Sequence, residues 1–228
     1  MFPIKDTVPV RRIPLVNWLI ITANVLVFMY ESLLPPDQLN HFIYLFGLTP
    51  SYLVRHWIPD GMTILTSMFL HGGWLHLISN MWALYIFGDN VEDRVGHFRY
   101  LVFYLLCGVI AAATQVISAV DSPVPMVGAS GALSGILGAY LVLFPRARVI
   151  TLVPLFFLPW FVEIPVFFYL GLWFLSQLFN GMFTLAVSGI IGTYGGVAWW
   201  AHIGGFGTGL VLVKFFEQRP TYDDRYSE

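Results

Sequence analysis

Apolar stretches that are long enough to cross a membrane limit the fold of this chain more than any other feature. A transmembrane helix needs about 20 mostly apolar residues, and charged, proline-containing or glycine-rich segments separate six stretches that approach or reach this length. They lie at about 15–34, 74–87, 98–120, 128–144, 161–179 and 197–216. The sequence therefore predicts an all-α fold: a polytopic membrane protein in which residues 1–228 form a single membrane-embedded domain, a bundle of six transmembrane helices.

The composition agrees with a membrane protein and argues against several other classes. Of the 228 residues, 57% are hydrophobic and 11% are charged, whereas a soluble domain carries about 25% charged residues. The net charge of −2 and the lack of an extended basic patch argue against a nucleic-acid partner. The single cysteine, Cys107, excludes a disulfide framework or a thiolate metal cluster within one chain. We expect no metal and no cofactor.

The basic residues predict the orientation in the membrane. If the N-terminus is cytoplasmic and six helices alternate, Arg55 is the only one of the 11 Lys and Arg residues that lies outside. Because cytoplasmic loops are enriched in Lys and Arg, we expect both termini to be cytoplasmic. The segment 37–73 is then external, and its many aromatic residues favour a position in the membrane interface. A solvent-exposed loop with a few anchoring side chains is the alternative.

Small residues line the start of the fourth apolar stretch. Gly131 and Gly135 stand about one helical turn apart, and Gly205 and Gly209 have the same spacing in the sixth stretch. Gly128 precedes the first pair and adds to the same run of small residues. Because small residues let two helix backbones approach closely inside a membrane, we expect the fourth and sixth helices to pack through these glycines.

This packing would bring Ser130 against His202. Both residues lie near the outer ends of their helices, and His76 and Asn80 of the second helix lie at about the same depth. His76 and Asn80 are four residues apart, so they share one helix face. Each group alone has an ordinary explanation, since a serine among glycines usually serves packing and a lone histidine can be a hydrogen-bonded core group. Four polar groups at one depth of an apolar bundle indicate a functional site instead.

The four groups fit nucleophilic catalysis. A serine hydroxyl needs a base to remove its proton, and imidazole has a suitable pKa. His202 is the only histidine in the last four apolar stretches, so it is the predicted base for Ser130. Asp121 and Glu163 lie at other depths, which predicts a Ser–His dyad without a carboxylate. An oxyanion requires hydrogen-bond donors, and the candidates are the side chains of Asn80 and His76 and the backbone N–H of Ser130.

Four sequence motifs agree with this site. They are F-G-L-T-P at 46–50, H-G-G-W-L-H-L-I-S-N at 71–80, G-A-S-G at 128–131 and A-H-I-G-G-F-G-T-G at 201–209. Together they resemble the motifs of the rhomboid family of intramembrane serine proteases, and the resemblance extends over about 14–216. There is one departure: Met62-Thr63 stands where many relatives carry Trp-Arg, which leaves open how the first external loop is held.

The resemblance implies a function and a mechanism. It assigns Ser130 as the catalytic nucleophile, His202 as the base, and Asn80 and His76 as oxyanion partners. It also implies a six-helix core whose active site is reached by water from outside, and a mobile fifth helix that, with the loop at 180–200, admits the substrate. The family cuts transmembrane segments of other proteins near the outer face. The expected partners are therefore transmembrane substrates and the lipid bilayer, and the expected location is a prokaryotic plasma membrane.

Two other classes remain open at this point. A catalytically inactive relative could bind membrane proteins without cutting them, although such relatives typically lack the serine or the histidine. A haem or transport protein could use His71, His76 and His202, although His71 and His76 are five residues apart and do not share a helix face well. The metalloprotease motif H-E-x-x-H is absent. The six stretches also lack the two intramembrane aspartates that an aspartyl protease would need.

Overall fold

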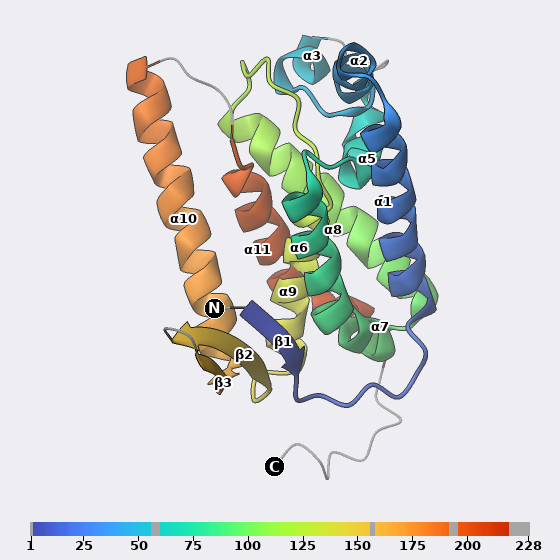
Figure 1. Ribbon diagram of the computed structural model, residues 1–228, viewed down its shortest axis with the longest axis vertical. Coiled ribbons are helices and arrows are strands. Elements are labelled where there is room, and N and C mark those ends of the chain that lie inside the picture. Colours follow the sequence, from blue (N-terminus) through green and yellow to red (C-terminus); the bar gives the residue numbers. More distant parts are fainter. Residues whose placement is uncertain (1, 56–59, 156–157, 192–195, 219–228) are drawn as a thin grey trace.

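The computed structural model describes residues 2–55, 60–155, 158–191 and 196–218, and most of these residues are helical. The long helices lie side by side in one bundle (Figure 1). They are α1 (Leu15–Leu33), α6 (Trp74–Ala83), α8 (His97–Ser118), α9 (Ser130–Leu143), α10 (Val166–Ile191) and α11 (Trp199–Phe216). Helix α6 continues through a π-helical turn, η2 (Leu84–Gly88), into α7 (Asp89–Val95).

Five of the predicted stretches overlap these helices closely, namely those at 15–34, 74–87, 98–120, 128–144 and 197–216. Among the described residues, three helices are long and apolar enough to cross a membrane, and Ser130–Leu143 is a shorter apolar helix. The three are Leu15–Leu33, His97–Ser118 and Val166–Val187. The apolar helices support an integral membrane protein, whereas the count of six spans stays a prediction.

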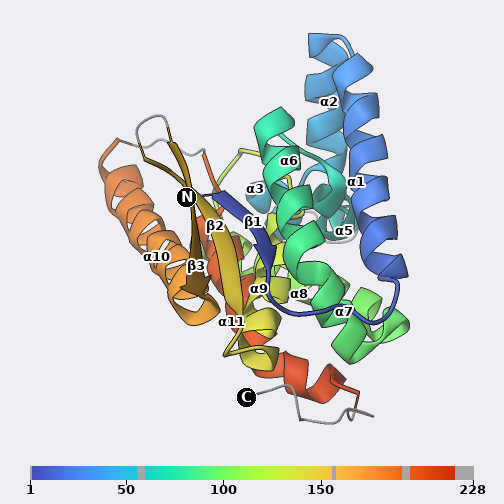
Figure 2. The same ribbon diagram turned by 60° about the horizontal axis from the view of Figure 1, so that its bottom comes forward.

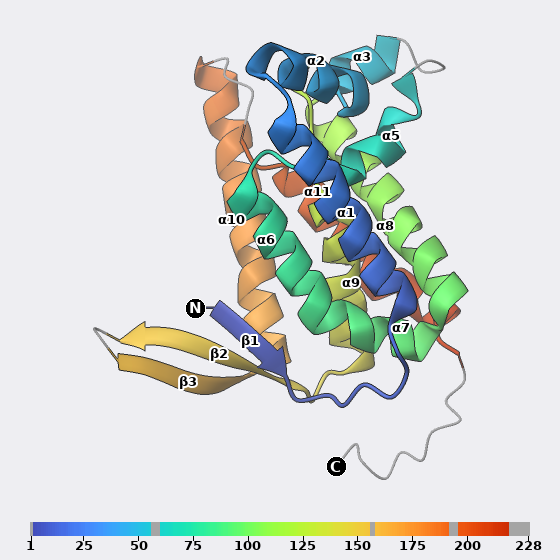
Figure 3. The ribbon, with the colours of Figure 1, turned by 45° about the vertical axis from the view of Figure 1, so that its right-hand side comes forward.

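The structure corrects the all-α prediction, because it contains a small antiparallel sheet. The strands are β1 (Phe2–Asp6), β2 (Arg148–Leu155) and β3 (Leu158–Pro165), in the order β1-β2-β3. Figure 2 shows them side by side, and in Figure 3 the β2–β3 hairpin projects to one side of the bundle. The segment is apolar and rich in β-branched and aromatic residues, and it contains three prolines, Pro154, Pro159 and Pro165, which would interrupt a helix. This composition favours strands over a helix.

The fifth predicted stretch, 161–179, differs from the structure at both ends. Its first five residues belong to β3, and α10 starts only after Pro165. The helix then continues to Ile191, so most of the predicted loop at 180–200 is helical. Residues 192–195 of that loop lie outside the described residues. Hydrophobicity alone does not distinguish a short apolar strand from the start of an apolar helix, so the start of the helix was misplaced.

The predicted external segment 37–73 forms short helices at one end of the bundle, at the top of Figure 1. They are α2 (Pro36–Phe46), α3 (Pro50–Arg55), α5 (Thr63–Thr66) and the 3₁₀ turn η1 (Ser67–Phe69). Residues 56–59 of this segment lie outside the described residues. None of the residues of α2 is buried within the protein, and its contact with a membrane stays a prediction.

Helix α9 forms the centre of the bundle, and it touches α11 backbone to backbone. A Cβ atom added to Gly205 would lie 2.0 Å from the carbonyl oxygen of Gly131. A Cβ atom added to Gly209 would lie 1.9 Å from the carbonyl oxygen of Gly135. Real Cβ atoms do not approach an oxygen this closely, so only glycine fits at these two positions of α11. The spacing between α9 and α11 is therefore set by the absence of side chains.

The sheet is attached to the C-terminal end of α9 through a half-buried carboxylate. Asp6 of β1 accepts hydrogen bonds from the hydroxyl of Tyr140 and from Nδ2 of Asn90, the second over 2.8 Å. Burial raises the pKa of Asp6 to about 6, although its hydrogen bond with Tyr140 lowers it in part. Strand β1 thus connects α7 and α9 at the end of the bundle opposite α2.

Gly209→Ala should destabilise the protein by about 1–3 kcal/mol, the usual cost of overpacking a tight core. The added methyl group would collide with the Gly135 carbonyl. Gly207→Ala is the matched control on the same helix, because a Cβ atom there has no other atom within 4 Å. Unfolding of both variants in mixed detergent and SDS measures the difference. Equal stability of the two variants would contradict the close contact of α9 and α11.

Candidate active site

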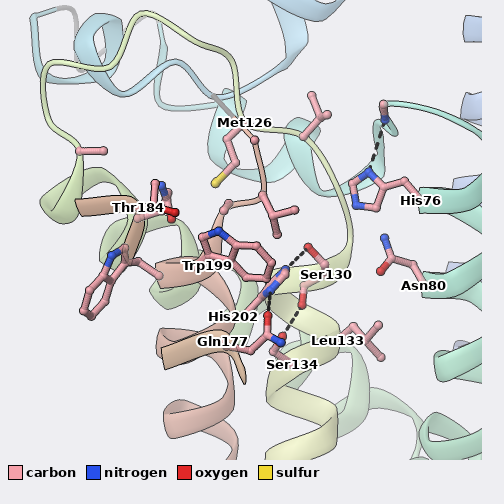
Figure 4. A pocket seen from close by; sticks show the side chains of 18 of the residues that line it. His76, Asn80, Met126, Ser130, Leu133, Ser134, Gln177, Thr184, Trp199 and His202 are labelled. Carbon is pink, nitrogen blue, oxygen red and sulfur yellow. Dashed lines mark hydrogen bonds between the residues drawn. The ribbon is translucent and has the colours of Figure 1, made fainter. Parts of the chain in front are cut away.

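A cavity of about 810 Å³ lies between α6, α9, α10 and α11. Its walls are largely apolar, with a small group of polar side chains that meet at one level (Figure 4). The polar side chains that matter for chemistry come from all four helices: His76, Asn80, Ser130, Gln177 and His202. A mostly apolar cavity with a few convergent polar groups is typical of an active or binding site.

Ser130 and His202 are within hydrogen-bond distance. Ser130 is the first residue of α9 and His202 the fourth of α11, and Ser130 Oγ lies 2.8 Å from His202 Nε2. The glycine contacts described above hold the two backbones close enough for these short side chains to meet. The exposed fraction of His202 is only 8%, so the cavity is the route by which solvent or a ligand reaches the pair. The predicted proximity is thus present in the structure, and the catalytic roles stay predictions.

His76 and Asn80 stand on α6, across the cavity from this pair (Figure 4). A Cβ atom on Gly128 would lie 2.8 Å from His76 Nε2 and 3.6 Å from Ser130 Oγ, so both atoms face the space beside Gly128. Gly128 has φ +129°, a conformation that other residues rarely adopt. Glycine at this position therefore leaves the room in which the imidazole of His76 faces Ser130.

Asn80 has an unused donor. The side chain is buried, with 5% of its surface exposed, and its Nδ2 has no hydrogen-bond partner among the described residues. A buried amide N–H without a partner is costly in a folded protein. Such a group is suited to donate to a ligand oxygen that enters the cavity, as the oxyanion role predicted for Asn80 requires.

One polar neighbour of His202 was not predicted from the sequence. Gln177 of α10 is 5% exposed, and its Oε1 lies 2.8 Å from His202 Nδ1. The prediction of a dyad considered only carboxylates as a third partner. A polar residue in an otherwise apolar helix was the available signal, because such residues seldom lie in a membrane without a partner.

The arrangement fits acyl transfer with a serine nucleophile. The hydroxyl, the imidazole and possible oxyanion donors surround one cavity, as this chemistry requires. In the described part of the chain, no group of three or more His, Cys, Asp or Glu residues could hold a metal ion. Two of the three histidines of the haem hypothesis, His71 and His76, pack edge to face with ring centroids 5.1 Å apart.

Comparison with known proteins relates the chain to one family. A family model described as "Rhomboid domain" matches residues 59–219. "Rhomboid-like protein 11, chloroplastic" of Arabidopsis thaliana is 38% identical over 97 residues, which cover 42% of this chain and 34% of that protein. "Rhomboid protease GluP" of Bacillus subtilis (strain 168) is 33% identical over 128 residues, or 56% of this chain and 24% of that protein.

A third relative is "RHOMBOID-like protein 6, mitochondrial" of Arabidopsis thaliana, 32% identical over 149 residues. The match covers 65% of this chain and 41% of that protein. The chain thus spans less than half the length of each of the three curated relatives. Two of the three are plant proteins whose names include an organelle, and the third is a bacterial protein.

A serine activated by histidine should react with a fluorophosphonate probe, which phosphonylates nucleophilic serines. We expect wild-type protein to be labelled and Ser130→Ala to lose the label, measured by intact-protein mass spectrometry. Ser134→Ala is the control, because the Ser134 hydroxyl is one turn away and already donates to the Ser130 carbonyl oxygen over 2.6 Å. Labelling of Ser130→Ala at the wild-type rate would rule out Ser130 as the reactive serine.

Proposed function

The chain belongs to the rhomboid family, since the rhomboid model covers well over half of its length, residues 59–219, and we propose that it is an intramembrane serine endopeptidase. It cuts transmembrane segments of membrane proteins near the outer face. Ser130 is the nucleophile and His202 the base. The observation that carries this proposal is the 2.8 Å distance between Ser130 Oγ and His202 Nε2 inside a cavity bounded by apolar helices.

The reaction follows from the roles of these side chains. His202 Nε2 takes the proton of Ser130 as its oxygen attacks the carbonyl carbon of the substrate. The unused amide donor of Asn80, the His76 imidazole and the Ser130 backbone N–H stabilise the negative oxygen of the tetrahedral intermediate. His202 then gives the proton to the leaving amine, and the acyl-enzyme forms. Water, activated by His202, releases the acid product and restores the serine.

The proposed orientation has six spans, an outward-facing active site and cytoplasmic termini. The short helices α2 and α3 lie at the top of Figure 1, whereas β1 and the end of α11 lie in its lower half. Arg94 pairs with Glu217, and Lys214 Nζ lies 3.1 Å from the same carboxylate, so these two cations share the lower end of the bundle. Basic residues at that end support its placement in the cytoplasm.

The membrane itself is a proposal as well. A prokaryotic plasma membrane agrees with the bacterial relative, while the plant relatives bear chloroplastic and mitochondrial names. A single membrane-embedded domain at 1–228 is proposed on the same basis. No metal or cofactor enters the proposed mechanism.

Entry of the substrate from the lipid is proposed between α6 and α10. The cavity lies between these helices, and both contribute to its wall. Helix α10 presents large apolar side chains to the outside, as a helix in contact with lipid would; those near the cavity mouth include Phe179, Met182 and Phe183. A substrate helix that arrives beside α10 would unwind where it meets Ser130.

Cleavage of a transmembrane substrate by purified protein in liposomes tests the proposal. We expect product from wild type and none from Ser130→Ala or His202→Ala. Loss of one oxyanion donor lowers kcat by about 10²–10³-fold, and we expect a decrease of this size for Asn80→Ala.

Asn40→Ala is the control for the asparagine substitution, because Asn40 is exposed on α2, away from the cavity. It should cleave like wild type. Wild-type turnover in Asn80→Ala would remove Asn80 from the mechanism. Equal product from wild type and Ser130→Ala would exclude the serine mechanism as a whole.

A further inference from the structure

The amide of Gln177 is fixed in one orientation. Its Nε2 donates to the backbone carbonyl oxygen of Trp173 over 3.1 Å and lies 2.9 Å from Ser176 Oγ. Reversing the amide would place Oε1 against the Trp173 carbonyl oxygen, where two acceptors would repel each other. Oε1 therefore points to His202 Nδ1, 2.8 Å away.

This orientation determines which nitrogen of His202 carries the proton. An amide oxygen only accepts hydrogen bonds, so Nδ1 of His202 must be the donor in the contact with Gln177. A neutral imidazole has one N–H, and Nε2 is therefore free to accept the proton of Ser130. Only this tautomer can act as the base at the 2.8 Å contact with Ser130.

No carboxylate is among the described hydrogen-bond partners of His202, which bonds through its ring to Ser130 and Gln177. Aromatic rings occupy the other sides: Trp173 lies 6.0 Å and Trp199 6.2 Å from the imidazole, centroid to centroid. These rings can hold the position of the imidazole, but they offer no acceptor to Nδ1. The amide of Gln177 is thus the group that can select the tautomer.

We propose that Gln177 is a positioning residue for the reaction. It completes a hydrogen-bonded triad of Ser130, His202 and Gln177, in which its amide oxygen keeps the proton of His202 on Nδ1. The inference rests on the proposed function, since it assigns a role within the same site. Gln177 stands on α10, whereas Ser130 and His202 stand on α9 and α11. The base is therefore complete only when α10 is packed against α11.

Three variants of the whole chain, residues 1–228, test this role. Gln177→Met keeps the length of the side chain but removes the acceptor, whereas Gln177→Glu keeps an acceptor oxygen. Leu175→Met places the same new side chain on the outer side of α10, where Leu175 is 59% exposed. Thermal unfolding in detergent verifies that all three variants are folded.

The first measurement is cleavage kinetics. Gln177→Met should lower kcat by about 10–10²-fold, part of the 10²–10⁴-fold that general-base catalysis supplies. KM should change little, because Gln177 acts through His202 and not on the substrate. Gln177→Glu should recover most of the lost kcat, and Leu175→Met should match wild type. A folded Gln177→Met variant with wild-type kcat would overturn the proposal.

The second measurement does not need a substrate. Solid-state ¹⁵N NMR of histidine-labelled protein in lipid reports which ring nitrogen of His202 is protonated, with the signals assigned from their loss in His202→Ala. Wild type should show protonated Nδ1 and bare Nε2, and Gln177→Met should show the other tautomer or a mixture. An unchanged tautomer in Gln177→Met would overturn the role of Gln177.

The two measurements also separate this inference from the proposed function. If wild type cuts no substrate but the tautomer depends on Gln177, the protease function fails and the positioning of His202 by Gln177 stands. If wild type cleaves through Ser130 and neither kcat nor the tautomer responds to Gln177→Met, the protease function is supported and the positioning role of Gln177 fails.

Discussion

The backbone contact between α9 and α11 is the constraint on which the rest of the site depends. Gly205 and Gly209 of α11 meet the carbonyl oxygens of Gly131 and Gly135 at distances that leave no room for a methyl group. In a membrane, where helices gain little from hydrophobic burial against each other, such close van der Waals contact is a main source of association. The same contact brings Ser130, at the N-terminal end of α9, within hydrogen-bond distance of His202.

The cavity is completed by two helices that are held differently. Helix α6 continues into η2 and α7, where Leu84, Phe87 and Val91 are buried in the core, so His76 and Asn80 stand on a well-supported wall. Helix α10 lies at the outside, and it meets α11 through the rings of Trp173 and Phe174 and through Gln177. The site thus lies between three parts of the bundle. Helices α9 and α11 are in close backbone contact, and α6 carries the oxyanion candidates. Helix α10 is the least buried of the three long apolar helices.

Much of the fold and part of the site could be predicted from the sequence. Five helix positions followed from hydrophobicity, and the meeting of Ser130 with His202 followed from the depth of both residues and the glycine spacing. The sheet did not follow, because the residues of β2 and β3 are as apolar as a helix of a membrane protein. Gln177 was missed because a search for a third partner that considers only carboxylates overlooks an amide.

The sequence by itself determined that this is a membrane protein of the rhomboid family and which residues carry its motifs, because apolar length and short motifs are properties of consecutive residues. Only the tertiary structure decided which nitrogen of His202 faces Ser130 and which group holds the other nitrogen. Those contacts join α9, α10 and α11 across 72 and 25 positions of the chain. Their geometry depends on how the three helices pack against one another, which no local pattern of residues encodes.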